Sequence, residues 1–346
     1  MSRVLLVASY PPRHCGIGRY ARAQAERLRT EGHDVTVISP PDGDGDIRVP
    51  FFGGRPFLTA ARMGRGFDRI VVHFQPALYY RPRAPLSKIA TSKALLWLCL
   101  RRRTTEILVH EADRPRWWRP DEVVLAAAFA VAPVLLFHTR AEHEALERQY
   151  RVRVRARLIR HVDGVAVRGP TSREDARRRL GIPQDEVVFV SPGFLQAHKG
   201  HERAVDAFRA LGTGRLYVVG SVRDGTPENL AYAESLRRVA GATPGLELIE
   251  RFLDDEEFDA WIAAADAVVL PYRRSWSSGA LARAQAIGTP AVVSAVGGLP
   301  EQATEHDVVV HDDQELVRAL GAIARRVDRE RGAAEERRPG QREVAP

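Results

Sequence analysis

The feature that most constrains the fold of this chain is an alternation of short aliphatic runs with segments of helical periodicity, which occurs twice along the sequence. The run Val4–Ala8 is followed by Ala21 and Ala25 at helical spacing. Uninterrupted apolar strands separated by helices are typical of a parallel sheet that is covered on both faces. Further strands of the first half are predicted at residues 35–38, 70–73, 107–110, 134–137 and 157–159.

The second half restarts the same pattern after a segment without periodicity, Gly164–Thr171, which predicts a linker. Strands are predicted at residues 187–190, 216–219, 246–249, 267–270, 291–294 and 308–310, and helices at 258–265, 281–287 and 314–327. We therefore expect an α/β protein with domains at residues 1–165 and 172–330 and a disordered tail at 331–346. Ligands of such sheets bind outside the carboxyl ends of the strands, so two facing domains predict an inter-domain cleft.

Composition and charge exclude several classes of protein. With 346 residues, 45% hydrophobic and 28% charged, the chain is neither fully disordered nor a fibrous repeat. The net charge of +8 favours anionic partners. Only three of the cations are lysines, so the arginine excess indicates a coding bias, and a nucleic-acid partner would rest on charge alone.

Three local features narrow the class of protein further. Cys15 and Cys99 form neither a disulfide framework nor a zinc-ligand spacing. The N-terminus lacks the pattern of a signal peptide, which favours a cytoplasmic protein. The longest apolar stretch, Val123–Phe137, contains Pro133 and is short for a membrane span, so it predicts a buried helix running into a buried strand.

A glycine-containing loop precedes the first predicted helix. Gly16 and Gly18 would let backbone N–H groups approach a phosphate at the helix N-terminus. With Ala21 they also match the dinucleotide-binding spacing. However, Gly16 lies eight residues after the strand end at Ala8, and no acid follows the second strand to hold a ribose. A tight turn without a ligand is the alternative.

A second candidate anion site lies in the segment Ser191–Gly200, between a predicted strand and a predicted helix. Lys199 is one of only three lysines, and its ammonium is a compact charge suited to an anionic group. The alternative is a solvated surface lysine.

The order and spacing of these motifs resemble those of family 4 glycosyltransferases, which have two facing Rossmann-like domains (the GT-B architecture). The resemblance runs from Met1 to about Val327. The segments that carry it are 10–18, 31–37, 193–200, 265–271, 288–294 and 297–301. It implies transfer of a sugar from a nucleotide-sugar donor, with retention of configuration and without an essential metal or other cofactor.

The resemblance also implies roles for individual residues. Gly16 and Gly18 would bind the donor phosphate through the backbone, together with Gly193, and Lys199 would bind the diphosphate. His110, which follows a predicted strand, matches the histidine beside the transferred sugar. Lysine and N–H donors would stabilise the charge of the leaving diphosphate. The leaving phosphate would take the proton of the acceptor, so no dedicated protein base is required.

The sequence departs from the family in its donor segment. Phe194 stands where the family commonly has arginine, and Ser275 and Arg283 stand where it has two glutamates. Arg283 cannot accept a hydrogen bond from a ribose hydroxyl; it would attract a phosphate or act as a structural helix cation. The remaining donor-binding candidates are Ser275, Ser278, Gly279 and Ala280. A catalytically degenerate homologue and a same-fold epimerase therefore remain alternatives to a working transferase.

The acceptor side is predicted from His73, Gln75 and Tyr79, which follow a strand of the first domain, and from Trp117 in a later loop. His161 and Asp163 are expected to be structural. Two segments, Lys93–Arg103 and Arg116–Arg119, combine apolar and basic residues, which suits contact with the inner face of a membrane. A core helix with a cationic end and an acceptor loop are the alternatives. The acceptor expected from the resemblance is a glycan, a lipid-linked molecule or another cell-envelope component; the donor base, the sugar and the oligomeric state stay open.

Overall fold

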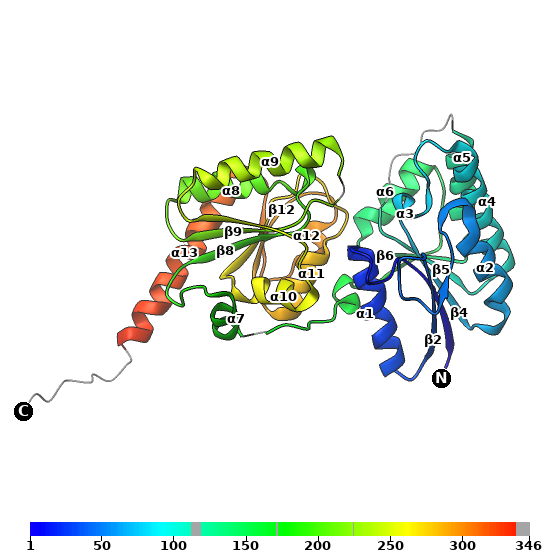
Figure 1. Ribbon diagram of the computed structural model, residues 1–346, viewed down its shortest axis with the longest axis horizontal. Coiled ribbons are helices and arrows are strands. Elements are labelled where there is room, and N and C mark those ends of the chain that lie inside the picture. The colour runs from blue at the N-terminus through cyan, green and yellow to red at the C-terminus, as the bar shows by residue number, and fades with distance from the viewer. Residues whose placement is uncertain (112–118, 171, 224, 337–346) are drawn as a thin grey trace, which may run out of the picture. The chain divides into compact units, whose positions relative to one another are not determined.

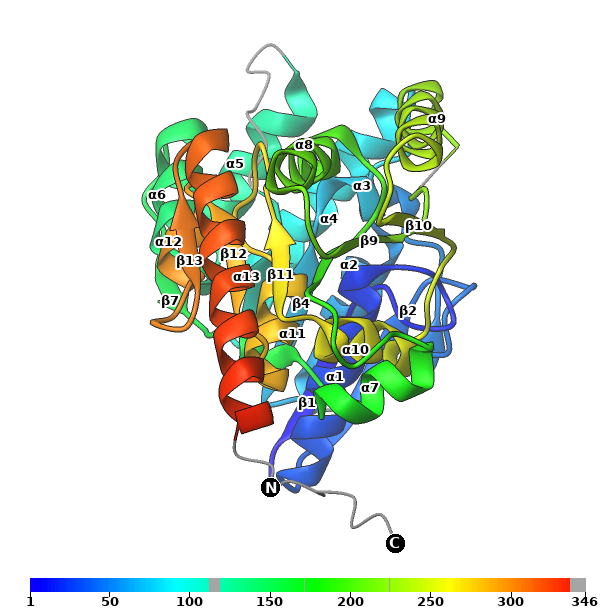
Figure 2. The same cartoon turned by 90° about the vertical axis from the view of Figure 1, so that its left-hand side faces the viewer.

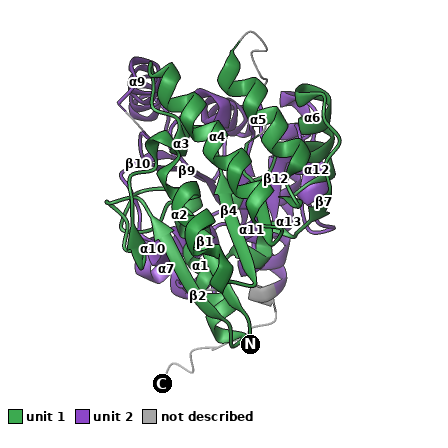
Figure 3. Cartoon of the chain, turned by 90° about the vertical axis from the view of Figure 1, so that its right-hand side faces the viewer, with its two compact units in different colours: residues 1–166, 276–279 green, residues 167–275, 280–346 purple. Residues whose placement is uncertain are grey.

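The computed structural model describes residues 1–111, 119–170, 172–223 and 225–336 and divides the chain into two compact units (Figure 1; Figure 3). Unit 1 comprises Met1–Ala166 and Trp276–Gly279, and unit 2 comprises Val167–Ser275 and Ala280–Pro346. Each unit is built on one parallel sheet. The two-sheet α/β class predicted from the sequence is therefore confirmed.

Unit 1 has a seven-stranded sheet in the order β3-β2-β1-β4-β5-β6-β7. Its strands are β1 (Arg3–Val7), β2 (Asp34–Ser39), β3 (Ile47–Arg48), β4 (Arg69–Phe74), β5 (Thr105–Val109), β6 (Val134–Phe137) and β7 (Ala156–Leu158). Its helices are α1 (Gly16–Thr30), η1 (Phe52–Gly54), α2 (Arg55–Met63), η2 (Gly64–Gly66), α3 (Pro76–Tyr79), α4 (Pro85–Arg101), α5 (Pro120–Val131), α6 (Arg140–Tyr150) and η3 (His161–Gly164).

Side-chain alternation along the strands of unit 1 explains why helices cover both faces. In β1, Leu5 and Val7 point into a core shared with α2, α4 and α5, whereas Val4 and Leu6 pack against α1. Figure 1 shows α2, α4 and α5 on the face of this sheet opposite α1. The very short strand β3 was not predicted.

Unit 2 has a six-stranded sheet in the order β10-β9-β8-β11-β12-β13. Its strands are β8 (Val188–Pro192), β9 (Arg215–Gly220), β10 (Leu246–Glu250), β11 (Ala267–Leu270), β12 (Ala291–Ser294) and β13 (Val308–Val310). Its helices are α7 (Arg173–Leu180), η4 (Ala197–Lys199), α8 (His201–Leu211), α9 (Pro227–Gly241), α10 (Asp255–Ala264), α11 (Gly279–Ile287), α12 (Leu299–Gln302) and α13 (Asp313–Glu336).

Two hydrophobic clusters hold the helices of unit 2 against its sheet. One joins α8, α9 and α13 to one face, and the other joins α7, α10 and α11 to the opposite face. Figure 2 shows α13 running alongside β13 and α8. Because α13 extends to Glu336, the tail predicted to be disordered from Arg331 begins at least six residues too early; residues 337–346 lie outside the described part of the chain.

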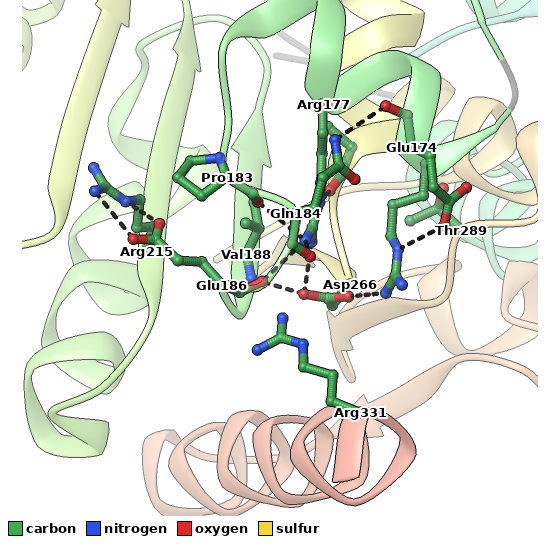
Figure 4. A network of polar contacts seen from close by, with 12 residues as sticks. Glu174, Arg177, Pro183, Gln184, Glu186, Val188, Arg215, Asp266, Thr289 and Arg331 are labelled. Atoms are coloured by element: carbon green, nitrogen blue, oxygen red, sulfur yellow. Dashed lines mark hydrogen bonds and ion pairs between the residues drawn. The ribbon is translucent and has the colours of Figure 1, made fainter. Parts of the chain in front are cut away.

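A fully buried arginine joins α7 to the sheet of unit 2 (Figure 4). The guanidinium of Arg177 donates to the backbone oxygens of Ala264, Gln184 and Glu186 at 2.9–3.0 Å. Its Nη2 forms an ion pair of 2.9 Å with Oδ2 of Asp266, the residue immediately before β11. One guanidinium thus joins α7 to the end of α10, to the loop before β8 and to the residue before β11.

For residues 123–137, the prediction of a helix followed by a strand is confirmed, but the prediction that the helix is buried is wrong. The chain forms α5 and then β6, as predicted. However, Val123 and Val131 of α5 are 47% and 41% exposed. The helix therefore presents an apolar outer face, which an apolar sequence alone cannot distinguish from a buried one. Within the described residues, no helix is both long and apolar enough to cross a bilayer.

Candidate active site

Four histidines lie at the carboxyl-end side of the unit 1 sheet around the ring of Tyr20. His73 is the penultimate residue of β4. His110 and His138 directly follow β5 and β6, and His161 is the first residue of η3. Their ring centroids lie 5.3–5.7 Å from that of Tyr20, with edge-on geometry. We call these five residues the histidine cluster. Parallel strands place their carboxyl ends at one edge, which is where α/β sheets bind ligands.

A chain of hydrogen bonds runs through the cluster to His110. Nε2 of His73 lies 2.8 Å from Oε1 of Gln24 on α1, and Nδ1 of His73 lies 3.1 Å from Nε2 of His110. With Gln24 as acceptor, His73 donates from Nε2, and its Nδ1 accepts from His110. This assignment leaves Nδ1 of the partly exposed His110 as a hydrogen-bond acceptor.

Burial keeps three of the four imidazoles, those of His73, His110 and His138, uncharged. It lowers the pKa of His73 to about 3 and of His138 to about 4, and it lowers the pKa of His110 well below its usual range with help from neighbouring imidazoles. His110 is thus suited to hydrogen bonding rather than to carrying a positive charge at neutral pH. In the described ranges, no three His, Cys, Asp or Glu side chains are placed to hold a metal ion.

A buried carboxyl group lies next to the cluster, on the first turn of α6. Burial raises the pKa of Glu142 to about 8, with a smaller contribution from the charge of Glu111, and the backbone of His138 opposes this shift. Thr139 caps α6: its Oγ1 accepts from the N–H of Glu142 and donates to the carbonyl of Trp276, both at 3.2 Å. Glu142 is therefore a neutral acid at pH 7, held beside the strand-end histidines.

The predicted acceptor-side residues separate into three groups. Gln75 is nearly buried, and its amide donates to Glu111 at 2.6 Å. Tyr79 is fully buried; its ring stacks on Phe51, and its hydroxyl donates to the carbonyl of His73, so it contacts the protein interior and not an acceptor. His73 is equally buried, and its imidazole is hydrogen-bonded to Gln24 and His110. Trp117 lies outside the described residues.

The two glycines of the first loop have different surroundings. Gly16 is the first residue of α1, and a Cβ placed there would meet no other atom within 4 Å. A Cβ on Gly18 would lie 3.3 Å from the backbone N of Tyr10, so Gly18 allows α1 to pack closely on the preceding turn. The open backbone at Gly16 is the feature expected of a phosphate-binding helix start.

The predicted anion segment of unit 2 is shaped by three glycines. Gly193 and Gly200 have φ values of 135° and 65°, and Cβ atoms on Gly200 and Gly220 would overlap the backbone oxygens of Pro271 and Gly193. Between them, Nζ of Lys199 lies 3.9 Å from the ring centroid of Tyr272. Tyr272 therefore orients the ammonium of Lys199. The sequence pattern did not predict this role of Tyr272.

The donor segment is divided between the two units. Trp276–Gly279 belongs to unit 1, whereas Ser275 and Ala280 belong to unit 2. Ser278 is buried, and the carbonyl of Ser275 accepts from the N–H of Gly298. These positions remain donor-binding predictions.

Arg283, which stands at an expected glutamate position, is buried in unit 2. Its Nη1 lies 3.0 Å from Oδ1 of Asp259 and 3.3 Å from Oδ1 of Asp255, both on α10. Burial raises the pKa of Asp259, and Arg283 opposes that shift. This geometry is that of the structural helix cation, one of the two roles expected for Arg283.

Sequence reasoning missed Tyr20, Gln24, His138 and Glu142. A signal for His138 was present, because a histidine stands at the end of three successive strands of unit 1. Gln24 and Tyr20 lie on α1 and meet the cluster through contacts between residues about fifty or more positions apart, which no local pattern reveals.

Comparison with known proteins gives matches along most of the chain. The model of a family described as Glycosyltransferase Family 4 matches residues 15–194, and one described as Glycosyl transferases group 1 matches residues 184–326. D-inositol 3-phosphate glycosyltransferase of Streptomyces griseus subsp. griseus is 33% identical over 168 residues, which are 45% of this chain and 35% of the relative. The protein of that name from Nocardioides sp. is 37% identical over 145 residues, 38% of this chain and 31% of the relative. The chain thus spans about a third of the length of these curated relatives.

Two solved structures illustrate the likeness in fold. Sucrose-phosphate synthase from Thermosynechococcus elongatus has a TM-score of 0.68 at 20% identity, covering 96% of this chain and 94% of that one. HepE of Anabaena in complex with UDP-glucose has a TM-score of 0.65 at 16% identity, covering 93% and 89%. At these identities the likeness shows the fold alone, and it confirms the predicted class.

Proposed function

Because this chain belongs to glycosyltransferase family 4, whose model matches more than half of it, we propose that it transfers a sugar from a nucleotide-sugar donor to an acceptor with retention of configuration. The observation that carries the proposal is the neutral His110, held by Gln24 and His73 at the carboxyl end of β5. The likeness to HepE, solved with UDP-glucose, supports a nucleotide-sugar donor. The donor base and the acceptor are left for experiment.

Breaking the bond between sugar and phosphate builds negative charge on the leaving diphosphate and positive charge on the sugar. The ammonium of Lys199 and the backbone N–H of Gly16 at the start of α1 are the groups proposed to stabilise the diphosphate. Nδ1 of His110 is proposed to accept a hydrogen bond from a hydroxyl of the transferred sugar. The leaving phosphate takes the proton of the acceptor, so the proposal needs neither a protein base nor a metal.

A second candidate function is a catalytically degenerate homologue that binds a nucleotide without transfer. The observation in its favour is the pairing of Arg283 with Asp255 and Asp259, which leaves no carboxylate at that position for a ribose. In the transferase proposal, hydroxyls of Ser275 and Ser278 replace the missing carboxylates. A cytoplasmic location and a cell-envelope acceptor, glycan or lipid-linked, belong to the same proposal.

Nucleotide binding and transfer are tested separately. UDP, GDP and ADP are compared by thermal shift, and at least one is expected to raise the melting temperature. Lys199→Met should abolish that rise, whereas Lys88→Met on α4 should retain it. A panel of nucleotide sugars is then followed by mass spectrometry for donor hydrolysis or transfer.

The outcomes distinguish the two candidates. Turnover with one donor supports the transferase, and a shift without turnover across the panel supports the degenerate homologue. A nucleotide response that survives Lys199→Met would remove Lys199 from the site.

A further inference from the structure

The outer face of α5 is apolar throughout. The exposed residues of this helix are Pro120, Val123, Ala127, Ala130 and Val131, none of which is polar. The inner residues of α5 already fill the core, so the outer ones are not needed for packing within unit 1. A helix on the surface of a soluble domain ordinarily carries polar residues on its outer face, so an apolar one indicates a surface that meets another apolar phase.

The neighbouring helix α4 continues this surface. Leu86, Ala90, Lys93, Trp97 and Leu100 follow one another at spacings of three or four residues and are all exposed. Leu86, Trp97 and Leu100 are 81%, 49% and 57% exposed. Because α4 and α5 pack against each other, the two outer stripes adjoin on the same side of the unit 1 sheet (Figure 1; Figure 3).

The helix α2 and the turn before it add to the same layer. Phe52 of η1 and Leu58 and Met63 of α2 are exposed, and both elements pack against α4. We call the exposed residues of η1, α2, α4 and α5 the α4 face. Of the twelve large hydrophobic residues that are exposed on the described part of the chain, eight lie on this face, so they form a patch and are not isolated surface residues. They are Phe52, Leu58, Met63, Leu86, Trp97, Leu100, Val123 and Val131.

The charge around this face is almost entirely positive. Between Ile47 and Thr105 the only acid is Asp68, against twelve cations: Arg48, Arg55, Arg62, Arg65, Arg69, Arg81, Arg83, Lys88, Lys93, Arg101, Arg102 and Arg103. On α5, the acids Asp121 and Glu122 are both paired with Arg119. Arg48 and Arg69 are paired with Asp44 and Glu106, which lie outside this stretch, and the segment that carries the face still has a large positive net charge.

The cations are also placed beside the apolar residues. The guanidinium of Arg101 lies 5.2 Å from the ring centroid of Trp97. Besides burial, the charges of Arg65 and Arg101 lower the pKa of Arg102, whose guanidinium donates to the carbonyl of Ala61 on α2. An exposed tryptophan, exposed leucines and several cations on one face are the components of an interfacial membrane contact.

We propose that the α4 face docks unit 1 on a bilayer surface rich in anionic lipid. Exposed Leu, Val and Trp side chains would enter the headgroup region, and the surrounding cations would bind lipid phosphates. A second copy of the chain would bring two positive faces together and is disfavoured by repulsion. A nucleic acid would satisfy the cations but leave the apolar stripe of α5 in water. The proposal does not depend on the transfer reaction.

Vesicle flotation tests the proposal with the full chain. Vesicles of phosphatidylcholine alone are compared with vesicles containing a large share of phosphatidylglycerol, at low and high salt. Binding to the anionic vesicles that weakens with salt is expected. Lys93→Gln with Arg103→Gln should weaken it about thirtyfold, since each cation near an anionic surface contributes roughly a fivefold factor, or about 1 kcal/mol. Trp97→Ser with Leu100→Ser should weaken binding at least tenfold at either salt concentration.

Matched control variants lie on unit 2. Arg238→Gln with Arg325→Gln removes two exposed cations, and Leu230→Ser removes an exposed leucine of α9; all should bind like the unaltered chain. Circular dichroism verifies that each variant is folded, and quenching of tryptophan fluorescence by brominated lipid gives a second readout with the unaltered protein. The proposal is overturned by absence of binding to anionic vesicles, by equal losses in the unit 2 variants, or by binding to DNA that the Trp97 and Leu100 changes leave intact.

Discussion

Replacing Arg177 by methionine tests how a buried cation holds α7 on the sheet of unit 2 (Figure 4). Methionine has a similar length and fills much of the same volume, so the change removes the charge and the donors more than the packing. It leaves the carbonyls of Ala264, Gln184 and Glu186 without this donor. It also removes one of the two arginines beside Asp266; the other, Arg173, remains at 2.6 Å.

The expected loss follows from these contacts. Removing one partner of a buried ion pair costs about 3–5 kcal/mol, because the other charge and its neighbours stay buried. Loss of the guanidinium donors to the three carbonyls acts in the same direction. In a unit of this size, each kcal/mol lowers the melting temperature by roughly 2–4 °C, which predicts a fall of about 6–20 °C for Arg177→Met.

The assay is thermal and urea unfolding followed by circular dichroism. The matched control is Arg178→Met on the same helix. The side chain of Arg178 is 66% exposed and pairs with Asp175, which predicts a loss under about 1 kcal/mol. Adding Asp266→Asn to Arg177→Met should recover part of the loss, because it removes the buried charge left behind. If Arg177→Met cost no more than Arg178→Met, the ion pair and the carbonyl contacts would not be what holds α7.

Three further predictions concern the histidine cluster and the glycine positions. Gln24→Leu should lower kcat/KM about tenfold while leaving nucleotide binding unchanged, because the proton position of His110 is no longer fixed through His73; steady-state kinetics and imidazole ¹⁵N shifts measure both effects. The free energy of unfolding should fall as the pH drops from the usual histidine pKa near 6.5 towards the pKa of about 3 of His73, since the unfolded chain binds the proton first. His73→Asn should reduce this slope by up to about 1.4 kcal/mol per pH unit, which urea unfolding at stepped pH measures. Gly200→Ala should destabilise unit 2 more than Gly181→Ala, as thermal unfolding will show. Gly181 has a similar φ of 68°, but a Cβ there would meet no atom within 4 Å, so Gly181→Ala should cost only about 1–2 kcal/mol.

Each of these predictions has a result that contradicts it. An unchanged ¹⁵N spectrum of His110 in Gln24→Leu would show that Gln24 does not fix the tautomer. A pH slope that His306→Asn, an exposed control, reduces as much as His73→Asn would show that the buried imidazole is not its source. Equal losses in the two glycine variants would show that the approach of Gly200 to Pro271 is not limiting.

The strands and helices were predictable because contiguous aliphatic runs and helical spacing are local properties of the sequence. Val4–Ala8 and Ala267–Leu270 could be placed within about a residue for this reason. The strand β3 has only two residues and therefore no period to detect. The outer face of α5 was misjudged, because Val123 and Val131 look the same in sequence whether they face a core or the surface.

The candidate site could be predicted only where a residue stands next to a strand or a glycine turn. His110 and Lys199 were identified in this way. The partners that position them, Gln24, Tyr20 and Tyr272, come from elements distant in sequence, so their roles arise from tertiary packing alone. The burial of Tyr79 and the ion pairs of Arg283 likewise follow from packing and from no local motif.

The assignment of Trp276–Gly279 to unit 1 has a consequence for any attempt to take the molecule apart. The polypeptide crosses between the units three times, after Ala166, before Trp276 and after Gly279. A protease cut after Ala166 therefore leaves Trp276–Gly279, a part of unit 1, on the fragment that carries unit 2. A fragment ending at Ala166 would lack the backbone oxygen of Trp276 that accepts from the hydroxyl of Thr139, so unit 1 cannot be excised as one uninterrupted stretch without losing a contact of its own.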